Sequence, residues 1–445
     1  MVCHTNMNTP LTVCFALVLG IARNSPAAVI GTNPPASPLT LERIAALPPD
    51  RQTVWKEYLA RSEGQLRADQ TLLFNEMKQR GVTEIIMPPA GRSDNRLPLN
   101  HPAAWYGETE ARRIADIVIS FQTPAGGWSK NLDLTHHRRA VGERFAHGNA
   151  SRLPGTSDQD VPRDLNWSYV GTFDNDATTT QLRYLAKVTA ALGPEHDSAY
   201  RAAFLQGMDY IFAAQYPNGG WPQVWPLQGG YHDAITFNDG AMVNVLRLLT
   251  ETAAGANEFA FVPLKTRTLA AASVRRGIDC LLETQIRVNG RRTVWCQQHD
   301  PLTLQPASAR NYEMPSQSGG ESAAILLFLL SLPESSPKIS AAVESAAVWF
   351  EKTKLPDVAF QAVGDEGRLL VPSPGASPLW ARYCEIGSDR PIFGERDKTI
   401  HDNVREISKE RRNGYSWFGD SPGRALQQYA RWRKTHPTVQ EPATK

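Results

Sequence analysis

The stretch QTPAGGW at residues 122–128 recurs as QYPNGGW at residues 215–221, and a degraded copy, QIRVNGRRTVW, runs from Gln285 to Trp295. Each copy follows an amphipathic run with apolar residues at helical spacing, such as ARRIADIVISF before the first copy. Because adjacent glycines permit tight turns, each unit predicts a helix that ends in a Gly-Trp turn. An internal repeat of this kind indicates the architecture more strongly than any local pattern does.

A second pattern follows each copy and opens another apolar run. It reads TFDNDATTTQLRYL at residues 172–185, TFNDGAMVNVLRLL at 236–249 and SGGESAAILLFLL at 318–330. The repeated unit is therefore a helix, a Gly-Trp turn, a loop, an acidic residue and a second helix. Consecutive hairpins of this kind predict an all-α fold, an α/α toroid whose long irregular loops form a cleft at one end. An open helical solenoid is the alternative, but the unequal spacing of the turns favours the toroid, because solenoids keep a stricter period.

Composition restricts the class of protein. The chain has 445 residues, is 41% hydrophobic and carries a formal net charge of +2 at pH 7. These values fit a globular protein with a sizeable core and give no electrostatic argument for a nucleic-acid partner. The five cysteines are scattered and show no CxxC spacing, which argues against a disulfide framework and against a zinc site.

The N-terminal part has a composition of its own. Residues 11–22, LTVCFALVLGIA, are too few to span a bilayer but fit the apolar core of a signal peptide, although no Lys or Arg precedes them. A buried helix or a misread start codon is the alternative. We therefore expect a secreted or periplasmic protein without membrane contact after processing. The predicted parts are a signal peptide (1–28), a linker and helical extension (29–100), the toroid domain (101–436) and a tail (437–445).

Acidic residues open the second helix of each repeat. Residues 174–176 read DND, Asn238 and Asp239 stand at the equivalent place, and Glu321 occupies it in the third repeat. Helix capping explains any one of these residues, but three at one end of a shared centre favour a common site. Carboxylate and amide oxygens suit a hard cation such as Ca²⁺. Because no EF-hand spacing is present, the ligands would come from separate repeats.

Arginines form the second group of candidates. Arg310 lies in the loop SARNYEMPS close to Tyr312, and Arg382, Arg390 and Arg396 fall within the stretch WARYCEIGSDRPIFGERDK. Guanidinium groups bind carboxylates in bidentate fashion, so arginines near a cation site indicate a polyanionic ligand. The alternative is a network of surface ion pairs with neighbouring carboxylates. Together with the predicted export, this pattern points to an acidic polysaccharide.

Several longer motifs carry a family resemblance. They are TPAGGWSKN, FDNDATTTQLRYLA, AQYPNGGWPQVWP, ITFNDGAMV, WCQQHD, ARNYEMPS, the stretch from Trp380 to Thr399, and NGYSWFGDSP. On these motifs, over about residues 105–425, the chain resembles pectate lyases of polysaccharide lyase family 10. The resemblance implies an (α/α)3 toroid that cleaves (1→4)-α-D-galacturonan by Ca²⁺-assisted β-elimination and releases 4,5-unsaturated oligogalacturonides. We expect a monomer that acts on polygalacturonate.

The resemblance also implies roles for individual residues. Arg310 of the ARNYEMPS motif would be the catalytic base, and Arg382 and Arg396 would bind substrate carboxylates. Asp239, together with Asp174 or Asp176, would hold the Ca²⁺ ion, and the spacing leaves open which of those two aspartates is the ligand. Tyr312 and Lys130, which lie in matching motifs, are assigned to substrate binding.

Three other functions have to be weighed. A glycoside hydrolase on the same toroid needs paired carboxylates, and Asp176, Asp239 or Glu321 could supply them. A non-catalytic protein could bind the same acidic polysaccharide, or a related uronate polymer, without cleaving it. The Gly-Trp repeat is also found in triterpene cyclases, but their DxDD motif is absent from this sequence.

Overall fold

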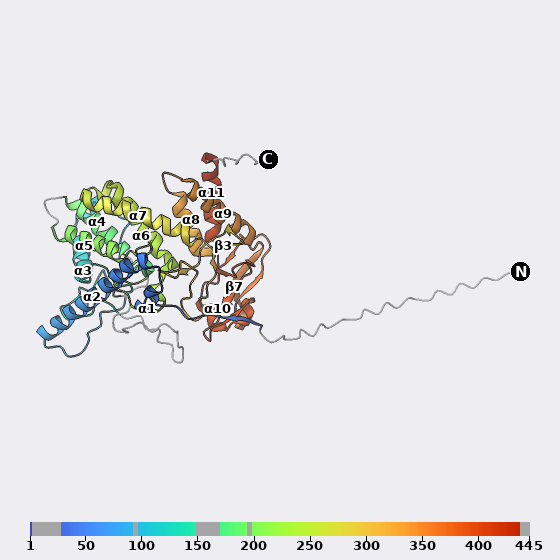
Figure 1. Cartoon of the computed structure of the whole chain (residues 1–445), viewed down its shortest axis with the longest axis horizontal. Helices are drawn as coiled ribbons and strands as arrows, with labels where there is room; N and C mark the ends of the chain where they lie inside the picture. Colours follow the sequence, from blue (N-terminus) through green and yellow to red (C-terminus); the bar gives the residue numbers. More distant parts are fainter. Residues whose placement is uncertain (2–27, 92–96, 148–169, 194–197, 437–445) are drawn as a thin grey trace.

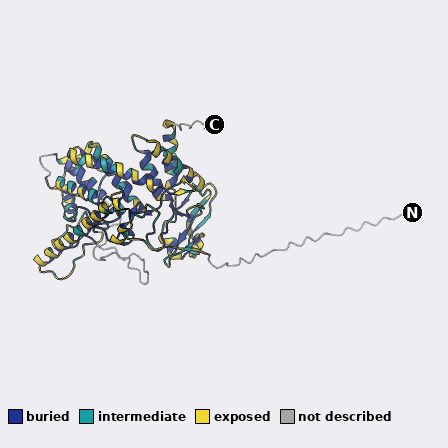
Figure 2. Ribbon diagram, in the orientation of Figure 1, coloured by how far each residue is buried: buried dark blue, intermediate teal, exposed yellow. Residues whose placement is uncertain are grey.

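The computed structural model describes residues 1, 28–91, 97–147, 170–193 and 198–436. The predicted signal peptide, except Met1 and Ala28, and the predicted C-terminal tail lie outside these ranges, as do residues 148–169 of the loop between the first turn and its acidic helix. Figure 1 shows a body of helices with short strands and the helix α10 gathered on one side of it. Buried residues line the facing sides of the helices, whereas α2 carries an exposed face (Figure 2).

Two rows of helices build the toroid. The first helices of the hairpins are α3 (Thr109–Ser120), α5 (Ser198–Ala214), α7 (Leu264–Thr284) and α9 (Pro337–Thr353). The second helices are α4 (Thr179–Leu192), α6 (Ala241–Ala254), α8 (Gly319–Leu330) and α11 (Ser421–Thr435). Helices α3, α5, α7 and α9 contact one another in this order, and α4, α6, α8 and α11 do the same. The α/α toroid predicted from the repeat is therefore confirmed.

The tryptophans of the Gly-Trp turns close the ends of the first helices. Each indole N–H donates a hydrogen bond to a carbonyl in the last turns of the preceding helix, where carbonyls otherwise lack partners. The bonds run from Trp128 to Val118 (2.7 Å), from Trp221 to Ile211 (2.9 Å) and from Trp295 to Leu281 (2.7 Å). Trp380 makes the same contact with Phe350 of α9 at 2.8 Å, without any Gly-Gly pair to announce it. The turn is thus architectural.

The glutamine that begins each turn joins neighbouring hairpins. Gln122 donates to the carbonyl of Gly126 in its own turn and to that of Ala203 on α5. Gln215 and Gln285 repeat this pair of bonds toward α7 and α9. The turns need glycine because a Cβ at Gly126, which has a φ of 102°, would lie 2.4 Å from the carbonyl oxygen of Gln206. Each turn therefore fixes the spacing between consecutive first helices.

Short strand pairs hold the loops at the cleft end of the toroid. The pairs are β2 (Ile235–Thr236) with β5 (Gln298–His299), β6 (Gln317–Ser318) with β10 (Tyr383–Cys384), and β9 (Trp380–Ala381) with β13 (Phe418–Gly419). Within the third turn, β3 (Arg287–Val288) pairs with β4 (Arg291–Arg292). A longer hairpin joins β7 (Val358–Val363) to β8 (Gly367–Pro372), and α10 (Lys409–Gly414) contacts β8.

The N-terminal segment is packed onto the toroid. Strand β1 (Val29–Thr32) pairs with β12 (Thr399–His401), which also pairs with β11 (Phe393–Gly394). The short helix α1 (Leu41–Ala45) follows, and then α2 (Pro49–Gln79), whose Tyr58 hydroxyl donates to the carbonyl of Ala214 at 2.9 Å. Helix α2 lies within the segment 29–100, for which a linker and a helical extension were expected. The residues before α2 are packed onto the toroid, because Leu39 and Ile44 are fully buried.

Candidate active site

Backbone hydrogen bonds from the Gly-Trp turns place the acidic positions of the three repeats in register. The amides of Thr172, Thr236 and Ser318 donate to the carbonyls of Trp128, Trp221 and Trp295 at 3.0, 3.1 and 2.8 Å. Three residues beyond these anchors stand Asn175, Asp239 and Glu321, which are therefore equivalent. The repeat thus delivers one polar side chain from each of three hairpins to the same end of the toroid.

Two of these positions lie in short 3-10 turns, η3 (Asp174–Asp176) and η5 (Asn238–Gly240), which contact each other. Asn175 and Asp239 both adopt the left-handed conformation, with φ of 50° and 49°. Asn and Asp tolerate this conformation better than other non-glycine residues. The tight turns direct the polar side chains of both segments toward one space, so that the charge of Asp174 is felt at Asp239.

Asp174 forms a buried ion pair with Lys130, whose ammonium group donates to Oδ2 of the carboxylate. Burial alone would raise the pKa of Asp174, but the charge and hydrogen bond of Lys130, helped by Arg310, lower it. The other carboxylate oxygen, Oδ1, is buried and has no hydrogen-bond partner among the described residues. Burial and the charge of Lys130 lower the pKa of His232 nearby to about 3, which keeps this imidazole neutral.

Asp239 is exposed and lies close enough to other acids to be affected by their charges. Asn238 donates to its Oδ2 at 2.8 Å, and the structure records no ion pair for it within the described ranges. Burial and the charge of Asp174 raise the pKa of Asp239 to about 6, although Arg382 acts in the opposite direction. Asp176 is exposed and accepts a hydrogen bond from Asn244. The two carboxylates therefore remain accessible from the cleft.

Arg310 is held by its own loop. Its Nη1 donates to the hydroxyl of Tyr312 at 3.3 Å and lies 3.5 Å from Oε1 of Glu313, while its backbone amide donates to Oε2 of Glu313 at 3.1 Å. The hydroxyl of Tyr415 donates to the same Oε1 at 2.7 Å. Glu313 is buried, so this carboxylate orients the arginine while the side chain of Arg310 stays partly exposed.

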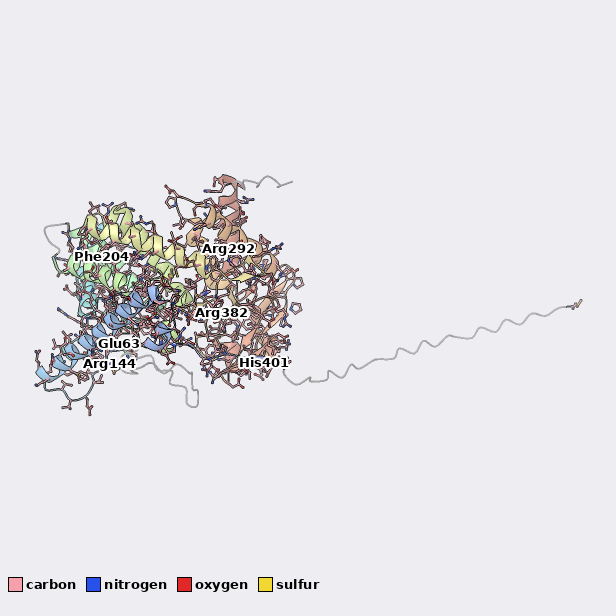
Figure 3. The ribbon with its side chains drawn as sticks, in the orientation of Figure 1. Glu63, Arg144, Phe204, Arg292, Arg382 and His401 are labelled. Carbon is pink, nitrogen blue, oxygen red and sulfur yellow. The ribbon has the colours of Figure 1, made fainter. Side chains whose placement is uncertain are left out.

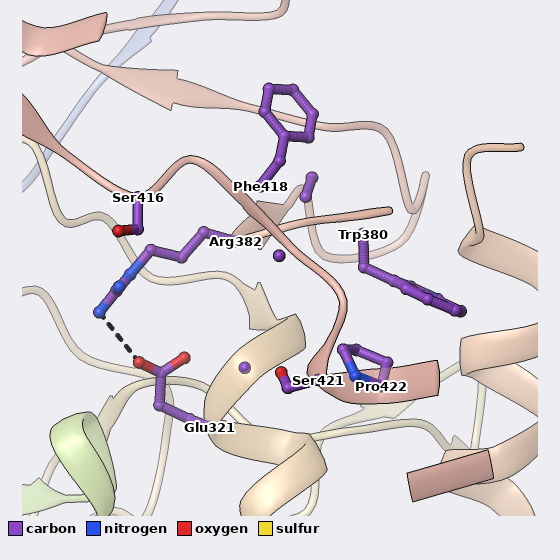
Figure 4. A pocket seen from close by; sticks show the side chains of 10 residues that line it. Glu321, Trp380, Arg382, Ser416, Phe418, Ser421 and Pro422 are labelled. Atoms are coloured by element: carbon purple, nitrogen blue, oxygen red, sulfur yellow. Dashed lines mark hydrogen bonds and ion pairs between the residues drawn. The ribbon is translucent and has the colours of Figure 1, made fainter. Parts of the chain in front are cut away.

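Arg382 joins the second and third repeats. Its Nη2 donates to Oδ1 of Asn238 at 2.9 Å, to Oε1 of Glu321 at 3.0 Å and to Oε1 of Gln297 at 3.2 Å. Its guanidinium lies over the ring of Tyr415, 4.7 Å from the ring centre. Figure 3 places it near the middle of the molecule, and Figure 4 shows its ion pair with Glu321 at the edge of a hollow of about 180 Å³.

Arg396 lies on the far side of Tyr312. It makes two parallel hydrogen bonds of 3.0 Å with Glu410, and its guanidinium is 5.6 Å from the centre of the Tyr312 ring. Tyr312 is itself buried, and its ring contacts the guanidinium groups of both Arg396 and Arg411. Arg390, by contrast, belongs to an exposed network with Glu385 and Asp402. Arg390 therefore lies in a surface ion-pair network, although its partners are not the expected Asp389, Glu395 and Asp397.

The candidate residues thus form one continuous group, from Lys130 and Asp174 through Asp239 and Arg382 to Arg310 and Arg396. Sequence reasoning gave no role to Glu313, Gln297 or Tyr415, which orient the arginines. All three lie within the quoted motifs ARNYEMPS, WCQQHD and NGYSWFGDSP. The motifs therefore marked these positions, but the sequence alone did not indicate that their side chains hold the arginines. A fourth residue, Asn33, donates hydrogen bonds from its side-chain amide to the carbonyls of Arg310 and Asn311. It is remote from them in sequence, and no sequence pattern indicated this contact.

Within the part of the chain that the structure describes, no three His, Cys, Asp or Glu side chains are grouped closely enough to hold a metal by themselves. The described residues also contain no helix with the length and apolar character needed to cross a bilayer.

Comparisons with known proteins agree on one family. The profile of the pectic acid lyase family matches residues 122–426. A family 10 polysaccharide lyase from Cellvibrio cellulosa, solved as an aspartate-to-alanine mutant in complex with trigalacturonic acid, is 31% identical with a TM-score of 0.62, and the alignment covers 77% of this chain and 99% of that one. A second structure of the family 10 lyase from Cellvibrio cellulosa is 30% identical with a TM-score of 0.61, covering 76% and 99%. No curated protein sequence matches the chain significantly.

Proposed function

Because the chain belongs to the pectic acid lyase family and is a family 10 polysaccharide lyase, we propose that it cleaves (1→4)-α-D-galacturonan by Ca²⁺-assisted β-elimination, with Arg310 as the base. The observation that carries the proposal is the convergence of a partly exposed arginine, a second arginine and accessible carboxylates at one end of the toroid. Arg310 lies close enough to Asp174 to lower the pKa of that carboxyl, and Arg382 acts in the same way on Asp239.

The donor set supports a hard cation. Asp239 has no ion-pair partner among the described residues, and burial together with the charge of Asp174 raises its pKa. Oδ1 of Asp174 is buried without a hydrogen-bond partner, so it has an unused acceptor. Oxygen ligands of this kind suit Ca²⁺. Asp239 with Asp174 or Asp176 would hold the ion, and a substrate carboxylate would complete a shell that the protein leaves open.

A bound Ca²⁺ would supply a positive charge that draws electron density from the substrate carboxylate. The protein's own groups do the rest. Arg382 and Arg396 bind uronate carboxylates, and Lys130 keeps Asp174 ionised. Arg310 takes the proton from C5, the electrons of that C–H bond form the C4=C5 double bond, and the C4–O bond breaks. Arg310 then carries the C5 proton, and the departing oxygen takes up a proton from Arg310 or from the solvent with which Arg310 exchanges it, so that no water is consumed.

Arginine is normally protonated, because its pKa lies above about 12. A neighbouring positive charge favours the neutral form, and Arg310 needs that form in order to accept a proton. The proposal therefore implies that activity rises toward alkaline pH. A profile centred on acidic pH would point instead to a carboxylate base such as Asp239.

The test is an ultraviolet assay for the unsaturated product on polygalacturonate, with chelator and after Ca²⁺ is restored. Wild type should form the chromophore only with Ca²⁺. Arg310→Ala should bind polygalacturonate and form none, while Arg390→Ala, which lies outside the site, should behave as wild type. New reducing ends without the chromophore would show hydrolysis and refute elimination. Binding without any cleavage would support the non-catalytic alternative.

We also propose that the protein is exported, with residues 1–28 as the signal peptide and residues 101–436 as the catalytic domain. The apolar run at residues 11–22 and a polymeric substrate support export. The N-terminal sequence of the protein purified from culture medium or periplasm tests this. An N-terminus at Met1 would contradict it.

A further inference from the structure

The toroid carries a basic hollow that the proposed chemistry does not use. It measures about 380 Å³ and is lined by Arg247 of α6, by Leu327 and Ser331 at the end of α8, and by α11. The lining residues of α11 are Arg424, Gln427, Gln428 and Arg431. Helix α8 contacts both α6 and α11, so it forms the floor of a groove whose walls bear arginines.

The arginines of this hollow differ from most surface arginines of the protein. Arg113, Arg390 and Arg405 are each paired with a carboxylate. Within the described residues, no hydrogen bond or ion pair is recorded for the side chains of Arg424 and Arg431. Positive charge that is held close together without compensation is costly unless an anion binds it.

Arg247, on the other wall of the hollow, is also affected by neighbouring positive charges. Burial, together with the charges of Arg183 and Arg424, lowers the pKa of Arg247, while Glu251 and Asp176 act in the opposite direction. Glu251 is already engaged, because Arg183 makes two hydrogen bonds with it. Glu251 is therefore shared with Arg183 and does not by itself offset the charge of Arg247.

The hollow lies on a path that starts at the active site. The smaller hollow of about 180 Å³ beside Arg382 is lined by Glu321 at the beginning of α8 and by Ser421 at the beginning of α11. At a rise of about 1.5 Å per residue, Leu327 lies roughly 9 Å further along α8 than Glu321. On the other wall, Asn244 of α6 contacts Asp176, and Arg247 follows one turn later. The same three helices thus lead from the catalytic residues to the basic hollow.

We propose that this groove is a distal binding site for the carboxylates of a polyuronate chain whose cleaved bond lies at Arg310, a proposal that rests on the proposed function. Guanidinium groups match carboxylates in geometry, and Gln427 and Gln428 offer amides to sugar hydroxyls. The site would hold long chains and leave short ones unaffected, so it would determine the chain length that the enzyme prefers.

The experiment compares Arg424→Gln/Arg431→Gln with wild type over oligogalacturonates of increasing length. Each exposed ion pair contributes about 0.2–1 kcal/mol, so the double variant should raise KM for polygalacturonate roughly two- to thirty-fold and leave kcat and the KM for trigalacturonate unchanged. The deficit should grow with chain length and shrink at high salt, which screens exposed charges. Arg433→Gln is the matched control, because Arg433 lies on α11 and is paired with Glu344.

Retardation in gels that contain polygalacturonate measures the same affinity without turnover. If wild type is retarded more than the double variant but forms no unsaturated product, the proposed elimination fails while the groove stands. Equal losses on trigalacturonate and on long chains would overturn the groove. So would an equal loss in Arg433→Gln, or a double variant that binds long chains as wild type does.

Discussion

Asn33 connects the N-terminal segment to the loop of Arg310. Its side-chain amide donates to the carbonyls of Arg310 and Asn311, both at 2.9 Å, and to that of Glu313 at 3.3 Å. Asn33 is only 4% exposed, and it lies outside the region matched by the family profile. The pairing of β1 with β12 fixes its position. We therefore predict that Asn33 positions the catalytic loop without touching substrate.

The expected effect of Asn33→Ala follows from these bonds. Two good hydrogen bonds contribute about 1 kcal/mol each, and the longer third bond shares a donor and adds little. A loss of about 2 kcal/mol weakens the preference for the aligned loop by roughly thirty-fold. Because Arg310 acts only from the aligned position, kcat should fall by up to that factor. KM should change little, since Arg382 and Arg396 are held by other residues.

The assay measures kcat and KM on polygalacturonate together with the melting temperature. Asn33→Asp should be worse than Asn33→Ala, because a carboxylate oxygen would face carbonyl oxygens where an N–H now points. Asn403→Ala is the matched control, since Asn403 is exposed and accepts a bond from the amide of Arg405 away from the site. A lower melting temperature with an unchanged kcat in Asn33→Ala would refute positioning and leave a purely structural role.

Three further predictions concern the acids and the turns. The raised pKa of Asp239, about 6, means that the native state binds this proton more tightly than the unfolded chain, so its contribution to stability falls as pH rises from about 4 through 6. Asp239→Asn in chelator should therefore melt above wild type at pH 7 and level with it near pH 4; a lower melting point at pH 7 would contradict this. Lys130→Met breaks a buried ion pair and should cost about 3–5 kcal/mol in a denaturant titration; recovery on adding Ca²⁺ would assign Asp174 as a ligand, and no recovery would favour Asp176. Trp128→Phe removes the bond to the end of α3 and should cost about 1–3 kcal/mol, with kcat per folded molecule unchanged; a large loss of kcat would show that the turn is more than architectural.

The sequence predicted the toroid because the repeat encodes contacts of fixed offset. A copy of the Gly-Trp turn precedes three of the four tryptophans whose indole reaches the end of the preceding helix. Gln122 recurs as Gln215 and Gln285 because each joins adjacent hairpins. The contact of Trp380 was missed because nothing in its turn required a glycine pair. The contacts that require a glycine turn could therefore be predicted from the sequence. The equivalent contact of Trp380, which needs no such turn, could not.

The site was predictable where its residues lie in motifs and unpredictable where the fold brings distant segments together. Asp239, Arg310 and Arg382 were named in advance. Asn33 was not, because 277 residues separate it from Arg310 and its surroundings have the composition of a linker. A side chain that acts through three backbone carbonyls leaves no pattern in its own neighbourhood, since the partners impose no constraint on sequence.

The repeat also explains how one acid came to be available for a cation. Asn175, Asp239 and Glu321 occupy equivalent positions in the three repeats, but they differ in charge and in ion pairing. Glu321 is compensated by Arg382, and the first repeat carries a neutral amide at this place. Of these three positions, only Asp239 carries a carboxylate without an ion-pair partner among the described residues, and burial together with the charge of Asp174 raises its pKa. The repeat thus leaves the charge of Asp239 without an ion-pair partner in the described residues, close enough to Arg382 for that arginine to affect its pKa, and this is where the proposed cation would stabilise the site most.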